Sequence, residues 1–139
     1  MEALIVQFDT DNSPDIINIR TQVFVEEQGI DSAIDFDGLD DTATHVLVVS
    51  GGISVATGRM LDDGHIGRIA VLKNARNQGV GATVLKALLN EASKQGYKRV
   101  YLGSQMHATI FYEKLGFNTF GEVFMDAGLK HIEMEMFLG

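Results

Sequence analysis

An apolar strand that runs into a glycine turn and then into a helix is the feature that most constrains this chain. It occupies Ile69–Leu85, with the sequence IAVLKNARNQGVGATVL. Backbone N–H groups at a helix start have no intrahelical partner and lie at the positive end of the helix dipole, so this turn predicts an anion site. Gly79 and Gly81 lack Cβ atoms and let a ligand approach the backbone. The structural alternative is a tight turn that binds nothing.

Two common phosphate motifs are excluded at this turn. A Walker motif needs Lys followed by Ser or Thr after its second glycine, whereas Gly81 is followed by Ala82 and Thr83. A dinucleotide fingerprint needs a third glycine at position 84, which is Val84. What remains is the pattern Arg-x-x-Gly-x-Gly over residues 76–81.

Composition limits the classes of protein and partner. The 139 residues are 45% hydrophobic, which suits one domain spanning residues 1–139. No cysteine is present, so disulfides and thiolate chemistry are excluded. The start Met1–Val6 lacks a basic leader and no apolar run reaches membrane length, so we expect a cytoplasmic protein. The net charge of −8 argues against nucleic-acid or membrane partners, so an anionic ligand must be held by local geometry. Arg68, Lys73 and Arg76 cluster near the turn.

Hydrophobic periodicity predicts the order of the elements. Ser13 is expected to cap the first helix, with Pro14 at its first position. Gly51-Gly52 predicts a hairpin turn, and Gly116 predicts a helix end. The expected strands are 3–8, 45–49, 54–61, 65–72, 99–102 and a tail strand at 132–136, and the expected helices are 13–28, 80–92 and 108–115.

An acidic segment, residues 29–42, separates the first helix from the second strand. Its acids are Asp31, Asp35, Asp37, Asp40 and Asp41. Runs of like charge usually face water, so we expect a solvated surface loop. The alternative is a cover over a cationic substrate.

The element order and three segments resemble the GNAT superfamily of N-acetyltransferases. Residues 69–81 resemble its acetyl-coenzyme A motif, and 108–117 (ATIFYEKLGF) resemble its next motif, a helix that ends in Gly-Phe. Residues 20–28 (RTQVFVEEQ) and the tail 126–131 (DAGLKH) resemble a bacterial subgroup of small, poorly characterised acyltransferases. The resemblance implies an α/β (α+β) GNAT fold, with a central mixed, mostly antiparallel twisted sheet flanked by helices.

The resemblance also implies acetyl-coenzyme A as co-substrate, with no metal ion. Amides from Gln78 to Thr83 would hold its pyrophosphate, and strand amides around residues 69–71 would pair with its pantetheine. Gln105 lies where the wider family often has an asparagine that contacts the coenzyme. The full implied set is Ile69, Ala70, Val71, Arg76, Asn77, Gln78, Gly79, Val80, Gly81, Ala82, Thr83, Gln105, Ala108, Phe111 and Tyr112.

Tyr112 occupies the position where many family members place a tyrosine that protonates the departing thiolate. A phenol with a pKa of about 10 and a thiol with one of about 8.5 are close enough to share a proton. The alternative is that Tyr112 only packs in the core.

The general base is left open, because Gly67 stands where the family commonly has a glutamate. The candidates are Glu26 and Glu27 at the end of the first helix, His107, and His131 in the tail. Each has a structural alternative as a surface or turn residue.

The predicted function is acetyl transfer from acetyl-coenzyme A to a small-molecule or peptide amine, by direct attack in a ternary complex. Two alternatives are kept: a coenzyme A-binding regulatory or interaction protein with little turnover, and a phosphate-binding module for another nucleotide. The acidic balance mildly favours a cationic acceptor, and a homodimer is left open.

Overall fold

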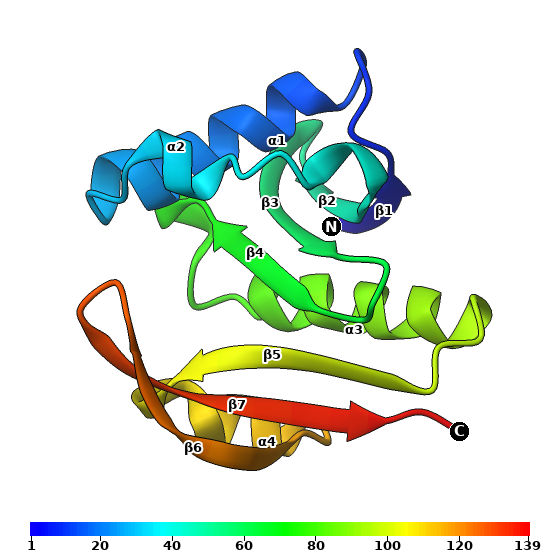
Figure 1. Cartoon of the computed structure of the whole chain (residues 1–139). Helices are drawn as coiled ribbons and strands as arrows, with labels where there is room; N and C mark the ends of the chain where they lie inside the picture. Colours follow the sequence, from blue (N-terminus) through cyan, green and yellow to red (C-terminus); the bar gives the residue numbers. More distant parts are fainter.

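The computed structural model describes all 139 residues, which form two antiparallel sheets with helices packed on them (Figure 1). The strands are β1 (Glu2–Val6), β2 (Thr44–Ser50), β3 (Ile53–Met60), β4 (Ile66–Val71), β5 (Arg99–Gln105), β6 (Asn118–Asp126) and β7 (Leu129–Phe137). The helices are α1 (Ser13–Arg20), α2 (Ser32–Asp35), α3 (Val80–Lys94) and α4 (Thr109–Lys114). A π-helical segment, η1 (Thr21–Glu27), continues α1, and short 3-10 turns lie at η2 (Asp40–Thr42), η3 (Lys73–Ala75) and η4 (Met106–Ala108). No helix has the length and apolar character needed to cross a bilayer.

The two sheets meet at one parallel bridge. The first has the order β1-β2-β3-β4 and the second β5-β7-β6, and the bridge joins His65 to Tyr101. The predicted mixed, mostly antiparallel arrangement is therefore confirmed. The predicted hairpin between β2 and β3 is confirmed as well, because Gly51 and Gly52 both have positive φ, as a tight hairpin turn requires.

Helix α3 packs against both sheets and so fixes the position of the turn at its start. Its buried face, Val84, Leu85 and Leu88, belongs to the larger hydrophobic cluster, which also includes residues from both sheets. A Cβ at Gly58 of β3 would lie 2.6 Å from Val84 Cγ1, so only glycine lets the helix pack this closely. Helix α1 packs through Ile16 and the rest of a second, smaller cluster.

Two local predictions are wrong. Ser13 is the first residue of α1 and caps nothing; instead, Asp9 Oδ1 accepts a hydrogen bond from Asn12 N at 2.9 Å. Strand β6 was not predicted at all. Its residues are mostly exposed, and a bulge between Phe120 and Phe124 interrupts the alternation by which a strand is recognised in a sequence.

The acidic segment 29–42 is mostly exposed, as expected of a surface loop, but two of its acids are not solvated. Asp35 and Asp40 are buried, and Arg20 donates to both, from Nε to Asp35 Oδ2 at 3.2 Å and from Nη1 to Asp40 Oδ1 at 2.7 Å. Arg59 of β3 donates to Asp40 Oδ1 at 3.0 Å and to Asp37 Oδ2 at 2.6 Å. These pairs were not predicted because both arginines come from other parts of the chain, so no local charge pattern reveals them.

These ion pairs set the charge state of the segment. The hydrogen bond from Arg59 holds the pKa of Asp37 far below its usual range. Burial alone would raise the pKa of Asp40, but the hydrogen bonds and charges of Arg20 and Arg59 outweigh burial and lower it. Both carboxylates are therefore ionised and fully occupied, which removes them as a cover for a cationic substrate.

Candidate active site

The glycine turn has the backbone geometry expected of an anion site. Helix α3 begins at Val80, and Gly79 before it adopts a left-handed conformation with φ of 76°. Asn77 also has positive φ, at 62°. At Gly81, the nearest atom to a Cβ would be Val71 Cγ2, 4.0 Å away, so the space above the first helical turn is open.

The backbone donors of the turn form a continuous run. None of the N–H groups from Asn77 to Ala82 has a hydrogen-bond partner within the protein. Thr83 differs from its expected role, because its N–H donates to Gly79 O at 3.1 Å and closes the first turn of α3. Its Oγ1 donates to the same oxygen, also at 3.1 Å. The run of free donors therefore ends at Ala82.

Arg76 ties the turn to two other elements. Its Nε donates to Val71 O at the end of β4 at 2.9 Å, and its Nη1 and Nη2 donate to both oxygens of Glu27, at 3.0 and 2.8 Å. The structure thus brings Glu27, a candidate base, to the turn. The hydrogen bond from Arg76 lowers the pKa of Glu27, which weakens this carboxylate as a proton acceptor.

Strand β4 is the last strand of its sheet, so its edge on the side away from β3 is free. Leu72 N donates to Val55 O at 2.9 Å, which directs Leu72 toward β3. Because successive residues of a strand point their N–H groups to opposite sides, the N–H of Val71 points to the free edge, as does that of Ile69. Ala70 lies opposite Thr57, and its N–H points toward β3.

A bulge interrupts β4 just before this edge. Two steps along β3, from Thr57 to Arg59, match three steps along β4, from Ala70 to Gly67. Arg68 supplies the extra residue and has a φ of 53°. Its guanidinium is held by Asp35 and Asp37 at 3.1 and 3.2 Å, so the buried ion pairs of segment 29–42 also stabilise the bulge. The sequence gives no signal for this bulge, because arginine has no preference for positive φ.

Strand β5 presents the facing edge. Tyr101 N donates to Gly64 O at 3.0 Å, and beyond this point β5 pairs only with β7. Figure 1 shows β4 and β5 running in the same direction and separating toward their C-terminal ends, where β4 leads into the turn before α3. The free edge of β4 therefore leads along the chain into the run of free N–H groups, and β5, which follows α3, presents the second strand edge.

Tyr112 lies on α4, half-buried against the larger cluster. Its ring meets Phe111 and Phe117 edge to face, with centroids 5.1 and 6.0 Å apart. No hydrogen bond occupies its hydroxyl, and burial raises its pKa. The phenol therefore stays protonated and is free to donate. Of the other candidates on this helix, Phe111 is 41% exposed, and Ala108 just before the helix is half-buried.

His131 and Gln105 are cross-strand partners on β7 and β5. His131 Nδ1 lies 2.9 Å from Leu129 O, and its ring stacks on Phe124. Strand alternation places His131 on the face opposite Met134, which packs in the core with Tyr112, so His131 and Tyr112 lie on opposite faces of the sheet. Glu26 and His107, the other two candidates for the base, are exposed.

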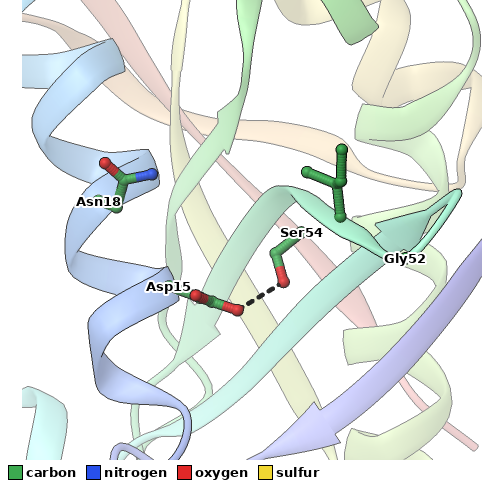
Figure 2. A pocket seen from close by; sticks show the side chains of 5 residues that line it. Asp15, Asn18, Gly52 and Ser54 are labelled. Atoms are coloured by element: carbon green, nitrogen blue, oxygen red, sulfur yellow. Dashed lines mark hydrogen bonds between the residues drawn. The ribbon is translucent and has the colours of Figure 1, made fainter.

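One shallow hollow lies away from these residues. Figure 2 shows it between α1 and the β2–β3 hairpin, where Ser54 Oγ donates to Asp15 Oδ2 at 2.8 Å. Its other lining residues are Asn18, Gly52 and Ile53. None of the candidate residues lines it. No group of three or more His, Asp or Glu side chains is placed to hold a metal ion.

Comparison with known proteins assigns the family. The sequence model of the acetyltransferase (GNAT) domain matches residues 14–138. The chain belongs to the GNAT acetyltransferase family. As a GNAT protein it is an acyltransferase, and its glycine turn falls inside the matched range. GNAT acetyltransferases use acetyl-coenzyme A and act on amines.

Individual relatives agree with this GNAT assignment. The chain is 35% identical to the uncharacterized N-acetyltransferase YjcF of Bacillus subtilis over 138 residues, covering 96% of this chain and 98% of that protein. The solved structure of an acyl-CoA N-acyltransferase from Pseudomonas aeruginosa superposes with a TM-score of 0.88 at 27% identity, covering 98% and 99% of the two chains. That of Escherichia coli ElaA gives 0.87 at 31% identity, covering 97% and 98%.

Proposed function

We propose that this protein transfers an acetyl group from acetyl-coenzyme A to a primary amine of a small molecule or peptide, by direct attack in a ternary complex. The observation that carries the proposal is the unbroken run of free N–H groups from Asn77 to Ala82, adjoining the free edge of β4. A diphosphate followed by an extended amide chain is the kind of ligand that fits such a surface.

The chain's own residues divide the binding between them. The free N–H groups at the start of α3 would hold the pyrophosphate, helped by the helix dipole. The N–H groups of Ile69 and Val71 would pair with the pantetheine amides, as an added strand pairs with a sheet edge. Arg76 adds positive charge beside the turn, although it is shared with Glu27.

Bound acetyl-coenzyme A supplies an acyl carbon that bonds to the amine nitrogen as its carbon–sulfur bond breaks. Tyr112 donates its hydroxyl proton to the departing sulfur and regains a proton from water. Its raised pKa keeps that proton in place until the thiolate forms. The amine must be neutral when it attacks, and Glu26, His107 and His131 remain candidates to accept its proton, Glu27 less so because of its pair with Arg76.

One observation favours the regulatory alternative. Position 67 of β4 is glycine, and a Cβ there would meet no atom within 4 Å, so β4 contributes no carboxylate beside the bulge. A protein that binds the coenzyme and turns over slowly would have this feature.

Two measurements test the proposal. Calorimetry compares acetyl-coenzyme A, coenzyme A and ATP, and we expect the two coenzymes to bind more tightly than ATP. A panel of amines is then screened for release of free coenzyme A thiol. Tight coenzyme binding without thiol release from any amine would support the regulatory protein, and a preference for ATP would overturn the coenzyme assignment.

A further inference from the structure

Glu133 of β7 differs from every other acidic residue of the chain. It is half-buried, and its carboxylate has neither a hydrogen bond nor an ion pair. The other acidic residues that are buried or half-buried all have partners: Asp35, Asp40, Glu91 and Glu135. Because the carboxylate has no partner in the protein, its oxygens are available to accept a charged hydrogen bond from a ligand cation.

The sheet leaves open space beside this carboxylate. Glu133 lies opposite Gly103 on β5 and Phe120 on β6. A Cβ at Gly103 would meet one atom, Phe124 Cζ at 3.4 Å. Because Gly103 has no side chain, nothing on β5 fills the position directly across from Glu133, and the ring of Phe124 forms one wall of the space.

This space adjoins the point where β4 and β5 separate. The parallel bridge joins His65 to Tyr101, so two residues further along each strand Gly67 and Gly103 are level. A Cβ at Gly67 would meet no atom within 4 Å. Side chains alternate along a strand, and the rings of His65 and Tyr101 stack 4.6 Å apart, so Gly67 and Gly103 lie on one shared face.

The neighbouring charges on this face are already paired. Glu135 accepts from Arg99 Nε at 2.7 Å, and the same guanidinium lies over the rings of Tyr101 and Phe120. Asp63 accepts from the Tyr101 hydroxyl. No cationic side chain of the protein forms an ion pair with Glu133, so its carboxylate is free to pair with a cationic ligand.

We propose that Glu133 binds the ammonium group of the acceptor, and that the acceptor is a primary amine with an apolar body that packs against Phe124. The inference rests on the proposed function and names its acceptor class. The ammonium would lie beside Gly67 and Gly103, next to the Arg68 bulge at the start of the free β4 edge. An acceptor held there by its nitrogen approaches the edge proposed to bind the coenzyme.

The test measures binding of a probe amine without turnover. Saturated with coenzyme A, wild-type protein and Glu133→Gln are titrated with 2-phenylethylamine, followed by NMR. A charged hydrogen bond at a half-buried site predicts at least about a tenfold rise in Kd for the variant. Glu2→Gln, on the exposed edge strand β1, makes the same chemical change far from the site and should leave Kd unchanged. The neutral probe 2-phenylethanol should bind both proteins equally.

Equal Kd values of 2-phenylethylamine for wild type and Glu133→Gln, or no binding to wild type, would overturn the inference. The inference would also be overturned if Glu133→Gln lost as much affinity for 2-phenylethanol as for 2-phenylethylamine, because that result would indicate a packing defect. Calorimetry with acetyl-coenzyme A is run in parallel on wild type and Glu133→Gln, and the two proteins should have the same Kd. If acetyl-coenzyme A fails to bind wild type, the proposed function fails, and the amine titration is then run on the two proteins without coenzyme, where it still decides the role of Glu133.

Discussion

At the scale of single residues, Tyr112 combines a fixed ring with a free hydroxyl. Phe111 and Phe117 hold the ring, and burial raises the pKa of the phenol. Tyr112→Phe keeps the ring and removes only the proton donor. We expect kcat to fall by about 100-fold or more, with the Kd of acetyl-coenzyme A and the thermal stability unchanged. Steady-state kinetics with any accepted amine, together with calorimetry, checks this.

The kinetic defect of Tyr112→Phe should not depend on which amine is used, because the proton goes to the sulfur and not to the acceptor. Phe111→Leu, a change to the more exposed ring beside it, is the control for packing and should lower kcat much less. Wild-type turnover in Tyr112→Phe would contradict the acid role and leave water as the proton source.

Residue predictions succeeded where the signal is local. The glycine turn and the helix that ends at Gly116 are encoded within a few positions, so the sequence was sufficient to place Gly79, Gly81 and Tyr112 on their elements. Glu133 falls within the expected tail strand at 132–136, but the sequence does not show that its carboxylate lacks a partner. Its isolation depends on Gly103 and on strand β6, which was not predicted, so no pattern along β7 alone reveals it.

At the scale of elements, segment 29–42 is held to α1 and β3 by its ion pairs. Asp40 accepts from both Arg20 and Arg59, all three being buried. Asp40→Asn leaves two buried guanidinium groups short of a counter-charge, so we expect the free energy of unfolding at pH 7 to fall by about 3 kcal/mol. Urea denaturation measures it. Asp41→Asn, at an exposed neighbouring position without a partner, is the matched control and should have no effect.

The same pairs predict the direction of the pH dependence. The pKa values of Asp37 and Asp40 are lowered in the folded protein, so their contribution is present above the unfolded pKa of about 3.9 and is lost as pH falls through the folded values. Wild-type stability should therefore decline below about pH 4, and Asp40→Asn should decline less steeply. Parallel slopes for the two proteins would contradict this account of Asp40.

The start of α3 gives a second prediction for an element. Gly81→Val introduces a branched side chain into open space, since only Val71 Cγ2 lies as near as 4.0 Å to a Cβ there. We expect the fold to persist and coenzyme binding to be abolished, because the side chain would block access to the free N–H groups. Calorimetry and circular dichroism measure the two effects. Ser93→Val, at an exposed position near the other end of α3, should bind normally. If Gly81→Val binds acetyl-coenzyme A normally, the turn is only structural.

At the scale of the whole molecule, two sheets share a single parallel bridge and leave two strand edges facing the same region. The sequence predicted the order of elements from β2 to α4 because their hydrophobic periods are strong. The separation of β4 from β5 was not predictable from these periods, since it depends on the Arg68 bulge and on where pairing between the two sheets stops. That separation exposes backbone amides of β4, and their rates of hydrogen exchange can be measured directly.

Hydrogen exchange at adjacent amides of β4 measures whether that exposed edge binds the coenzyme. Val71 N–H points to the free edge, whereas Leu72 N–H donates to Val55 O at 2.9 Å. In the free protein we expect fast exchange at Val71 and slow exchange at Leu72. Acetyl-coenzyme A should slow Val71 by far more than Leu72, because Leu72 gains only the global stabilisation that any bound ligand confers.

Adenosine 3′,5′-bisphosphate separates the two parts of the proposed site. It carries phosphates but no pantetheine, so it should bind near the start of α3 without slowing exchange at Val71. Equal protection of Val71 by this nucleotide and by acetyl-coenzyme A would show that the β4 edge does not pair with pantetheine. Slow exchange at Val71 in the free protein would show that the edge is already closed. Selective protection by acetyl-coenzyme A would link the separation of the two sheets directly to coenzyme binding.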